Sequence, residues 1–215
     1  MQKIWIVKTP ENNTSHTNEL LLQKVPKSLW IKANRYLNNE SSLHYIIGRL
    51  LLKKALIINK LPTSLLEEIH YSKHGKPSFL NHNFSISHSN GYVSLVFGTK
   101  FSIGIDIEKK KVIDLDLFHY LFTKDEWTSI QEDQNPLERF YWFWVRKEAL
   151  LKASGSSIKQ LKQLSVQERQ GKYKDKNYHF IPFEFDSNYN GIVATEEMIN
   201  FEVEIIKIED LSNLD

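Results

Sequence analysis

Two carboxylates stand two residues apart in the segment Gly104-Ile105-Asp106-Ile107-Glu108. On a β-strand, residues two apart share a face, so Asp106 and Glu108 project together while the isoleucines between them face the core. Adjacent carboxylates repel each other unless a cation lies between them, and oxygen ligands favour Mg²⁺ or Mn²⁺. The alternative is a solvated strand end whose acids are neutralised by residues 109–111, which are all lysine.

A third carboxylate stands in the segment that runs from Trp144 to Lys152. On a helix, Trp144, Glu148 and Lys152 follow one another at intervals of four and lie along one stripe. The simpler interpretation of Glu148 and Lys152 is a surface ion pair worth roughly 0.2–0.5 kcal/mol. The functional interpretation adds Glu148 to the two strand acids, and three carboxylates with a metal and lysines form a site for a polyanion such as a pyrophosphate.

Basic side chains elsewhere are candidates for binding such an anion. His88 ends a strand pattern on the face of Phe84 and Ile86, where it is either a satisfied core residue or a donor to a phosphate. Lys76 lies in a Gly-Lys-Pro loop and Lys32 on an early helix, and each is otherwise an ordinary solvated lysine.

The elements that must position these residues follow from hydrophobic periodicity and turn residues. Helices are expected over about 41–58, 116–121, 123–130 and 136–152, and the last of them should end at Gly155. Strands are expected over 4–7, 69–71, 84–89, 92–97, 103–107, 178–183, 192–195 and 201–208, with a hairpin turn at Asn90-Gly91. This order predicts an α+β protein with two halves, residues 1–99 and 100–215.

Composition narrows the possible classes of protein. The chain has 215 residues, no cysteine and a formal net charge of +2, which excludes disulfides, zinc-thiolate sites and cysteine nucleophiles and argues against bulk nucleic-acid binding. The most apolar stretch, residues 43–58, is interrupted by Arg49, Lys53 and Lys54. We therefore expect a soluble, cytoplasmic protein with no membrane contact.

The order of these motifs resembles the 4′-phosphopantetheinyl transferases. The matching segments are Gly75-Lys76-Pro77, Phe84-Ser85-Ile86-Ser87-His88-Ser89, Gly104 to Glu108, and Trp144-x-x-Lys147-Glu148-x-x-x-Lys152. Chain length and the first two segments are similar to the Sfp type. The resemblance spans residues 75–152.

The resemblance implies transfer of the phosphopantetheine arm of coenzyme A onto a serine of an apo acyl or peptidyl carrier protein, which releases adenosine 3′,5′-bisphosphate. Carriers of fatty-acid, polyketide and nonribosomal-peptide synthesis all remain open. The implied fold has two similar α/β halves with coenzyme A in the cleft between them and the active site there. We expect a monomer, because two halves already make one complete cleft.

The resemblance also assigns roles to residues of this chain. Asp106, Glu108 and Glu148 would hold Mg²⁺, Glu148 would be the candidate base for the carrier serine, and Lys152 would neutralise or protonate the leaving phosphate. The residues expected to bind coenzyme A are Lys32, His44, Lys76, His88, Lys147 and Lys152, with Glu126 in support.

One departure from the family concerns the long N-terminal helix. Many relatives carry an arginine four residues before a glycine of that helix, whereas here His44 precedes Gly48 at that spacing. The contacts to the 3′-phosphate would then be weaker, or Arg49 would substitute for the missing arginine from another face.

A docking surface for the carrier protein is expected beside the acidic strand. The candidate combines lysines with apolar residues and comprises Lys109, Lys110, Lys111, Leu117, Phe118, Tyr120 and Leu121. The alternative is that these apolar residues belong to the core. Two other functions also stay open: a non-catalytic module that binds coenzyme A or a carrier protein, and a Mg²⁺-dependent phosphohydrolase.

Overall fold

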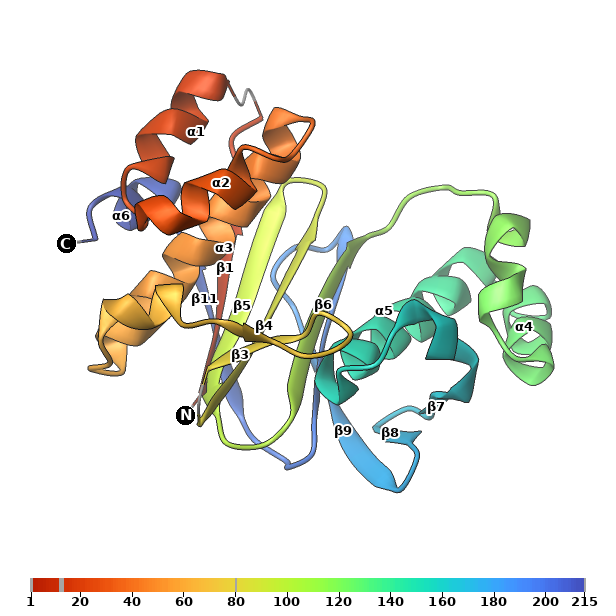
Figure 1. Ribbon diagram of the computed structural model, residues 1–215. Helices are drawn as coiled ribbons and strands as arrows, with labels where there is room; N and C mark the ends of the chain where they lie inside the picture. Colours follow the sequence, from red (N-terminus) through yellow and green to blue (C-terminus); the bar gives the residue numbers. More distant parts are fainter. Residues whose placement is uncertain (1, 12–13, 80, 215) are drawn as a thin grey trace.

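The computed structural model describes residues 2–11, 14–79 and 81–214 as a mixed α+β protein with two sheets (Figure 1). The first sheet has the strand order β11 (Phe201–Ile206), β1 (Gln2–Lys8), β5 (Tyr92–Thr99), β4 (His82–Ser89), β3 (Pro77–Phe79) and β2 (His70–Tyr71). The second has the order β6 (Ile103–Lys109), β10 (Tyr189–Thr195), β9 (Lys176–Phe183), β8 (Gln170–Tyr173) and β7 (Ser165–Val166).

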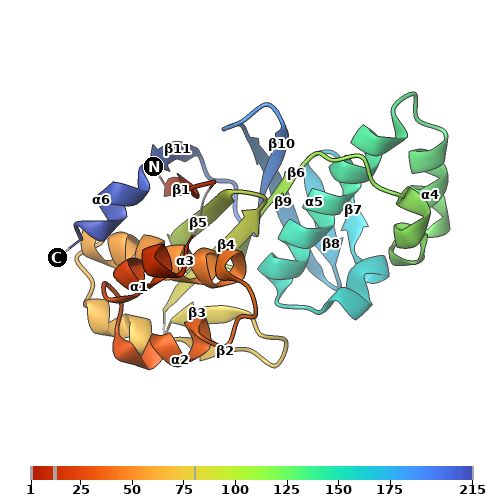
Figure 2. The same cartoon turned by 90° about the horizontal axis from the view of Figure 1, so that it is seen from above.

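Two long helices cover these sheets on opposite sides of the molecule (Figure 2). They are α3 (Asn39–Ile58), which packs on β5 of the first sheet, and α5 (Pro136–Ser154), which packs on β6 and β10 of the second. The shorter helices are α1 (Ser15–Leu22), α2 (Trp30–Ala33), α4 (Lys124–Gln131) and α6 (Ile208–Ser212). The 3₁₀ helices are η1 (Lys27–Leu29), η2 (Thr63–Glu67), η3 (Leu115–Leu121) and η4 (Ile158–Gln163).

The alternation of side chains along the strands explains this layering. In β1, Ile4 and Ile6 pack with Ile105 and Ile107 of β6, while Trp5 and its neighbours on the other face join the core under α3. Successive strand residues point to opposite faces, so each sheet buries one face against the other sheet. The prediction that Ile105 and Ile107 face the core is confirmed.

The predicted hairpin and the predicted long helices are present. Asn90 and Gly91 both have positive φ, 36° and 92°, as a two-residue type I′ turn requires. Helix α3 begins after a cap at Asn38, whose side chain accepts a hydrogen bond from Ser41 N. Helix α5 ends at Gly155 with φ 65°, the left-handed conformation expected of a glycine at that position.

The position of the last strand departs from the predicted division of the chain into residues 1–99 and 100–215. Strand β11 pairs in parallel with β1, so the chain after residue 200 returns to the first sheet. Lys3 Nζ and Trp5 Nε1 both donate to the Glu204 carboxylate across this pair. No helix in the described ranges has the length and apolar character needed to span a bilayer.

Candidate active site

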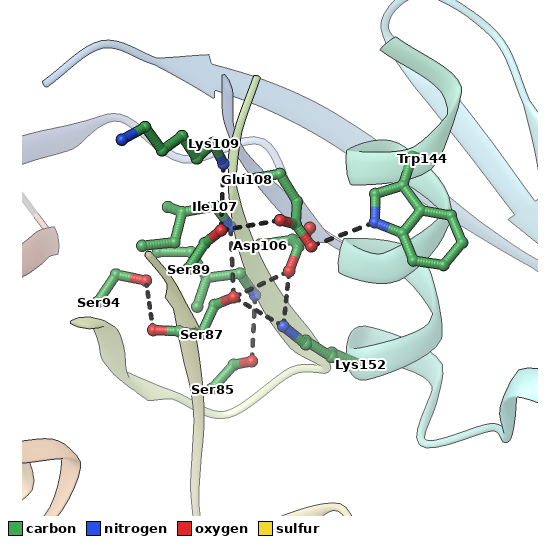
Figure 3. A network of polar contacts seen from close by, with 11 residues as sticks. Ser85, Ser87, Ser89, Ser94, Asp106, Ile107, Glu108, Lys109, Trp144 and Lys152 are labelled. Atoms are coloured by element: carbon green, nitrogen blue, oxygen red, sulfur yellow. Dashed lines mark hydrogen bonds and ion pairs between the residues drawn. The ribbon is translucent and has the colours of Figure 1, made fainter. Parts of the chain in front are cut away.

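Strand β6 carries the acidic pair and is an edge strand of its sheet. An edge strand has N–H groups that its own sheet leaves unpaired, and unpaired N–H groups in a protein interior are costly. Three serines of β4 provide acceptors instead, because Ser85, Ser87 and Ser89 Oγ accept from the N–H groups of residues 105, 107 and 109 (Figure 3). The two sheets are therefore joined beside the acids by hydroxyl groups.

Gly104 brings helix α5 close to this strand. A Cβ at Gly104 would lie 2.2 Å from the Ala149 carbonyl oxygen and 2.3 Å from Ala153 N, so only glycine allows this approach. Because Ala149 and Ala153 follow Glu148 and Lys152 in sequence, the close packing also brings those two charged residues to the acidic pair.

Lys152 and Asp106 form the central ion pair of the site. Lys152 Nζ lies 2.7 Å from Asp106 Oδ1, and both groups bond to Ser87 Oγ, at 2.9 and 2.8 Å (Figure 3). Asp106 is only 3% exposed, so the alternative of a solvated strand end is wrong for this residue. Its second oxygen, Oδ2, is buried without a hydrogen-bond partner among the described residues.

Glu108 is held by two donors. Ser89 Oγ donates to Oε2 at 2.9 Å, and Trp144 Nε1 donates to Oε1 at 3.2 Å. Trp144 thus has a polar role, which its position on the predicted helix stripe did not reveal.

The pKa values of all three acids are raised. Burial is the largest cause at Asp106, Glu108 and Glu148, and Asp106 raises the pKa of the other two by repulsion. The pKa of Glu148 rises to about 7, with the Lys152 charge acting against the rise. Three interacting carboxylates with raised pKa values form an environment that favours a proton or a cation.

The donor set suits a hard divalent cation. All three side chains offer oxygen, and the unpartnered Asp106 Oδ2 leaves one buried acceptor unused. Within the described part of the chain, however, no three His, Asp or Glu side chains are gathered closely enough to hold a metal ion as they stand. The three carboxylates nevertheless supply the oxygen donors that such an ion prefers.

A cavity of about 370 Å³ is lined by residues from two segments of the chain, 36–88 and 151–156. Its lining includes the predicted residues His44, Lys76, His88 and Lys152, together with Arg49, so the structure brings these five together. Helix α3, residues 74–77, strand β4 and the end of α5 all contribute lining residues.

Several buried polar atoms of α3 lack hydrogen-bond partners within the described residues, although His44 Nε2 lies 3.9 Å from a Glu40 carboxylate oxygen. They are His44 Nε2, Tyr45 Oη, and Arg49 Nε and Nη1. His44 and Arg49 are both 6% exposed, and all three residues line the cavity. Buried polar groups are normally hydrogen-bonded, so these atoms indicate a polar ligand at this end of the cavity.

The two cavity histidines stack on each other, with ring centroids 4.8 Å apart and planes at 27°. Burial lowers the pKa of His44. Desolvation at the cavity wall, together with His44 and the Lys152 charge, lowers the pKa of His88 to about 4. Both rings are therefore neutral at pH 7, and each can donate one hydrogen bond.

Lys76 lines the cavity, and Lys32 lies beside it. Lys76 Nζ donates to the Ala153 carbonyl oxygen of α5, and burial lowers the pKa of Lys76 to about 8. Lys32 is exposed, with Nζ 4.6 Å from the centre of the Tyr71 ring. The Tyr71 hydroxyl bonds to both Lys32 Nζ and Arg49 Nη2, which links these two cations.

The prediction that Lys147 contacts a phosphate of coenzyme A is wrong. Lys147 is fully buried, and its Nζ bonds to Glu126 Oε1 at 2.8 Å and to the carbonyl oxygens of Leu161 and Leu164. The reason is helical geometry, because Lys147 lies one position from the stripe of Glu148 and Lys152. Glu126 supports Lys147 and caps α4 through Thr123 N, so neither residue lines the cavity.

Some residues of the expected carrier-docking surface are packed in the core, and others are exposed. Phe118 and Leu121 pack against the aromatic core around Phe140, so the core alternative holds for them. Leu117 and Tyr120 are 67% and 60% exposed, and Val112 is 93% exposed.

Comparisons with known proteins agree with these motifs. Residues 102–196 match the model of the 4′-phosphopantetheinyl transferase superfamily. A provisionally named 4′-phosphopantetheinyl transferase of Haemophilus influenzae is 34% identical over 54% of this chain and 52% of its own length. The 4′-phosphopantetheinyl transferases gsp of Aneurinibacillus migulanus and Sfp of Bacillus subtilis are 29% and 27% identical, over 74% and 66% of this chain and 68% and 65% of their own lengths. The chain thus spans about half of the first relative and about two thirds of the other two.

Proposed function

We propose that the chain is a member of the 4′-phosphopantetheinyl transferase superfamily, whose model matches residues 102–196, and that it transfers the phosphopantetheine arm of coenzyme A to a serine of an apo carrier protein. The observation that carries the proposal is the position of Lys152, which pairs with Asp106 and also lines the cavity. One cationic group thereby joins an acidic cluster to a space bounded by basic side chains, as transfer from a pyrophosphate requires.

The proposed reaction is an in-line displacement at phosphorus. The carrier serine oxygen attacks the phosphorus that bears the pantetheine arm, and the bond from that phosphorus to the bridging pyrophosphate oxygen breaks. Adenosine 3′,5′-bisphosphate leaves with the bond electrons, next to the Lys152 ammonium. The serine proton passes to Glu148, directly or through a water.

We assign Asp106, Glu108 and Glu148 as the side chains that would hold Mg²⁺ or Mn²⁺. When bound, the ion would offset charge on the pyrophosphate oxygens. Support comes from the raised pKa values of all three acids and from the unused acceptor on Asp106.

The remainder of coenzyme A would occupy the cavity. His88 would donate to the pyrophosphate, and Lys76 would lie near the adenosine. The 3′-phosphate would be held by His44 and Arg49, with Lys32 beside the cavity. These residues would take the role of the arginine that many relatives carry at the position of His44. The unpartnered nitrogens of His44 and Arg49 support this assignment.

We further propose that the chain consists of two similar halves, 1–99 and 100–215 with β11 returning to the first. In support, each half places one long helix, α3 of 20 residues or α5 of 19, on the outer face of a sheet. The protein would act as a monomer in the cytoplasm. The carrier would dock on the exposed residues Val112, Leu117 and Tyr120 next to the lysines at 109–111.

The test is the intact mass of apo acyl and peptidyl carrier proteins after incubation with this protein, coenzyme A and Mg²⁺. We expect a gain of one phosphopantetheine arm that EDTA prevents. Binding of coenzyme A without any gain would instead indicate a binding module. Release of phosphopantetheine without a carrier would indicate a phosphohydrolase.

A further inference from the structure

The Ser87 hydroxyl is the point where three elements of the site meet. Its Oγ donates to Asp106 Oδ1 of β6 at 2.8 Å and accepts from Lys152 Nζ of α5 at 2.9 Å. It also accepts from Ile107 N at 3.3 Å (Figure 3). A serine hydroxyl has one donor and two acceptor positions, so all of its hydrogen-bonding capacity is used.

The position of Ser87 on β4 is itself fixed. The side chain is buried, with 3% exposed, and Ser94 Oγ of β5 donates to the Ser87 carbonyl oxygen at 3.3 Å. The next residue, His88, faces the opposite side of the strand and lines the cavity. Ser87 therefore connects the cavity wall of the N-terminal half to a charged pair that belongs to the C-terminal half.

The neighbouring serine on the same face has a simpler role. Ser85 Oγ accepts from Ile105 N at 3.1 Å and has no bond to Asp106 or Lys152 among the described contacts. Ser85 and Ser87 thus share the same strand, the same face and the same bond to the edge of β6. They differ in the two contacts to the charged pair, which only Ser87 makes, and in the cavity, which only Ser85 lines.

We propose that Ser87 is a positioning residue for the transfer reaction, acting through Lys152; this rests on the proposed function. Lysine carries a compact charge on a flexible stem, and Lys152 is only partly buried. Two acceptors, Asp106 Oδ1 and Ser87 Oγ, fix its ammonium at the acidic cluster. With one acceptor removed, the ammonium would sample positions away from the leaving phosphate.

The first test compares Ser87→Ala with Ser85→Ala. We expect Ser87→Ala to lower kcat by about 10- to 100-fold, the usual effect of removing a group that orients a site residue. The KM for coenzyme A should change by less than about threefold, since the hydroxyl does not line the cavity. Ser85→Ala removes a comparable bond to β6 together with a hydroxyl at the cavity wall, so it should change the KM for coenzyme A while kcat at saturating coenzyme A stays near the wild-type value. Equal kcat values for the two variants would overturn the proposal.

The second test asks whether Ser87 acts through Lys152. In a Lys152→Ala background, Ser87→Ala should lower kcat no further, because the group that it positions is already gone. A full additional loss in the double variant would contradict the proposal. If Ser87→Ala fails to fold by circular dichroism, Ser87→Cys keeps the volume with a weaker hydrogen-bonding group and should give an intermediate kcat. Wild-type kcat in Ser87→Cys would overturn the proposal in that case.

A third readout is independent of activity. The ¹⁵N-labelled ammonium of Lys152, assigned through its loss in Lys152→Ala, should be visible by NMR in the wild type and in Ser85→Ala, and absent in Ser87→Ala. An unchanged signal in Ser87→Ala would refute the positioning role. Absence of transfer by the wild type would instead refute the proposed function and leave this spectroscopic result standing.

Discussion

The α-carbon of Gly104 faces the backbone of α5 so closely that an added Cβ would lie 2.2 Å from the Ala149 carbonyl oxygen. The strand with the acidic pair and the helix with Glu148 and Lys152 meet at this contact. The helix backbone cannot yield as a flexible side chain would, so the contact sets the distance between the two elements.

Gly104→Ala should therefore displace α5 and damage both stability and activity. We expect a loss of at least about 1–3 kcal/mol in the free energy of unfolding, the usual cost of overpacking a core. We also expect a fall in kcat in the fraction that stays folded. Urea denaturation and the mass-shift assay measure the two effects.

Gly48→Ala is the matched control for this substitution. Gly48 lies inside α3, and its added Cβ would meet only the Ile86 side chain, at 3.4 Å. Alanine favours a helix interior by about 1 kcal/mol over glycine, so this variant should be neutral or more stable. A larger loss of stability in Gly48→Ala than in Gly104→Ala would refute the assigned role of Gly104.

The parts of the site that could be predicted from sequence are those coded locally. Strand alternation gave the shared face of Asp106 and Glu108, and helical spacing gave the stripe of Trp144, Glu148 and Lys152. The hairpin followed from Asn90-Gly91. Each of these patterns involves residues close in the chain, so no tertiary information was needed.

The remaining features depend on contacts between distant segments. The serines of β4 alternate visibly in the sequence, but their use as acceptors for β6 depends on how the two sheets meet. The return of β11 to β1 also joins segments about 200 residues apart. Lys147 carried a local signal that was missed, since Phe143 and Leu150 at helical spacing place it on the buried face.

Lys147→Ala is expected to destabilise the protein without impairing the chemistry. The substitution leaves the Glu126 carboxylate, which is 12% exposed, without its buried partner. Removing one member of a buried pair typically costs about 3–5 kcal/mol. Denaturant unfolding should show this loss, while the KM for coenzyme A of the folded protein stays at the wild-type value. A raised KM at unchanged stability would restore Lys147 as a phosphate ligand.

Arg49→Met should weaken binding of coenzyme A through the 3′-phosphate alone. Hydrogen bonds to charged groups contribute about 1.5–3 kcal/mol each, so KM should rise by about tenfold or more. Dephospho-coenzyme A, which lacks the 3′-phosphate, should show nearly equal KM values for Arg49→Met and the wild type. Equal weakening for both substrates would mean that Arg49 binds another part of the ligand or supports the fold.

Lys152→Ala should lower kcat more than it raises the KM for coenzyme A. The Lys152 charge matters most when negative charge develops on the departing phosphate, which is a property of the transition state. Steady-state kinetics with the carrier in excess separates the two constants. An unchanged kcat with a raised KM would make Lys152 a ground-state binding residue.

Glu148→Gln should change how stability depends on pH in a metal-free buffer with EDTA. The pKa of Glu148 is about 7 in the folded protein against an ordinary value of 4.5, so the folded state holds this proton more tightly than the unfolded state. The resulting stabilisation is complete below pH 4.5 and is lost as the pH rises through 7. Since glutamine does not ionise, Glu148→Gln should have a higher Tm than the wild type at pH 8, with little difference at pH 4.5. The gain in the free energy of unfolding has an upper limit of about 3 kcal/mol.

Added Mg²⁺ should raise the wild-type Tm at pH 8 and raise that of Glu148→Gln less, because the ionised carboxylate is what the cation would bind. Equal Tm differences at the two pH values would show that Glu148 is not held in the repulsive environment described here.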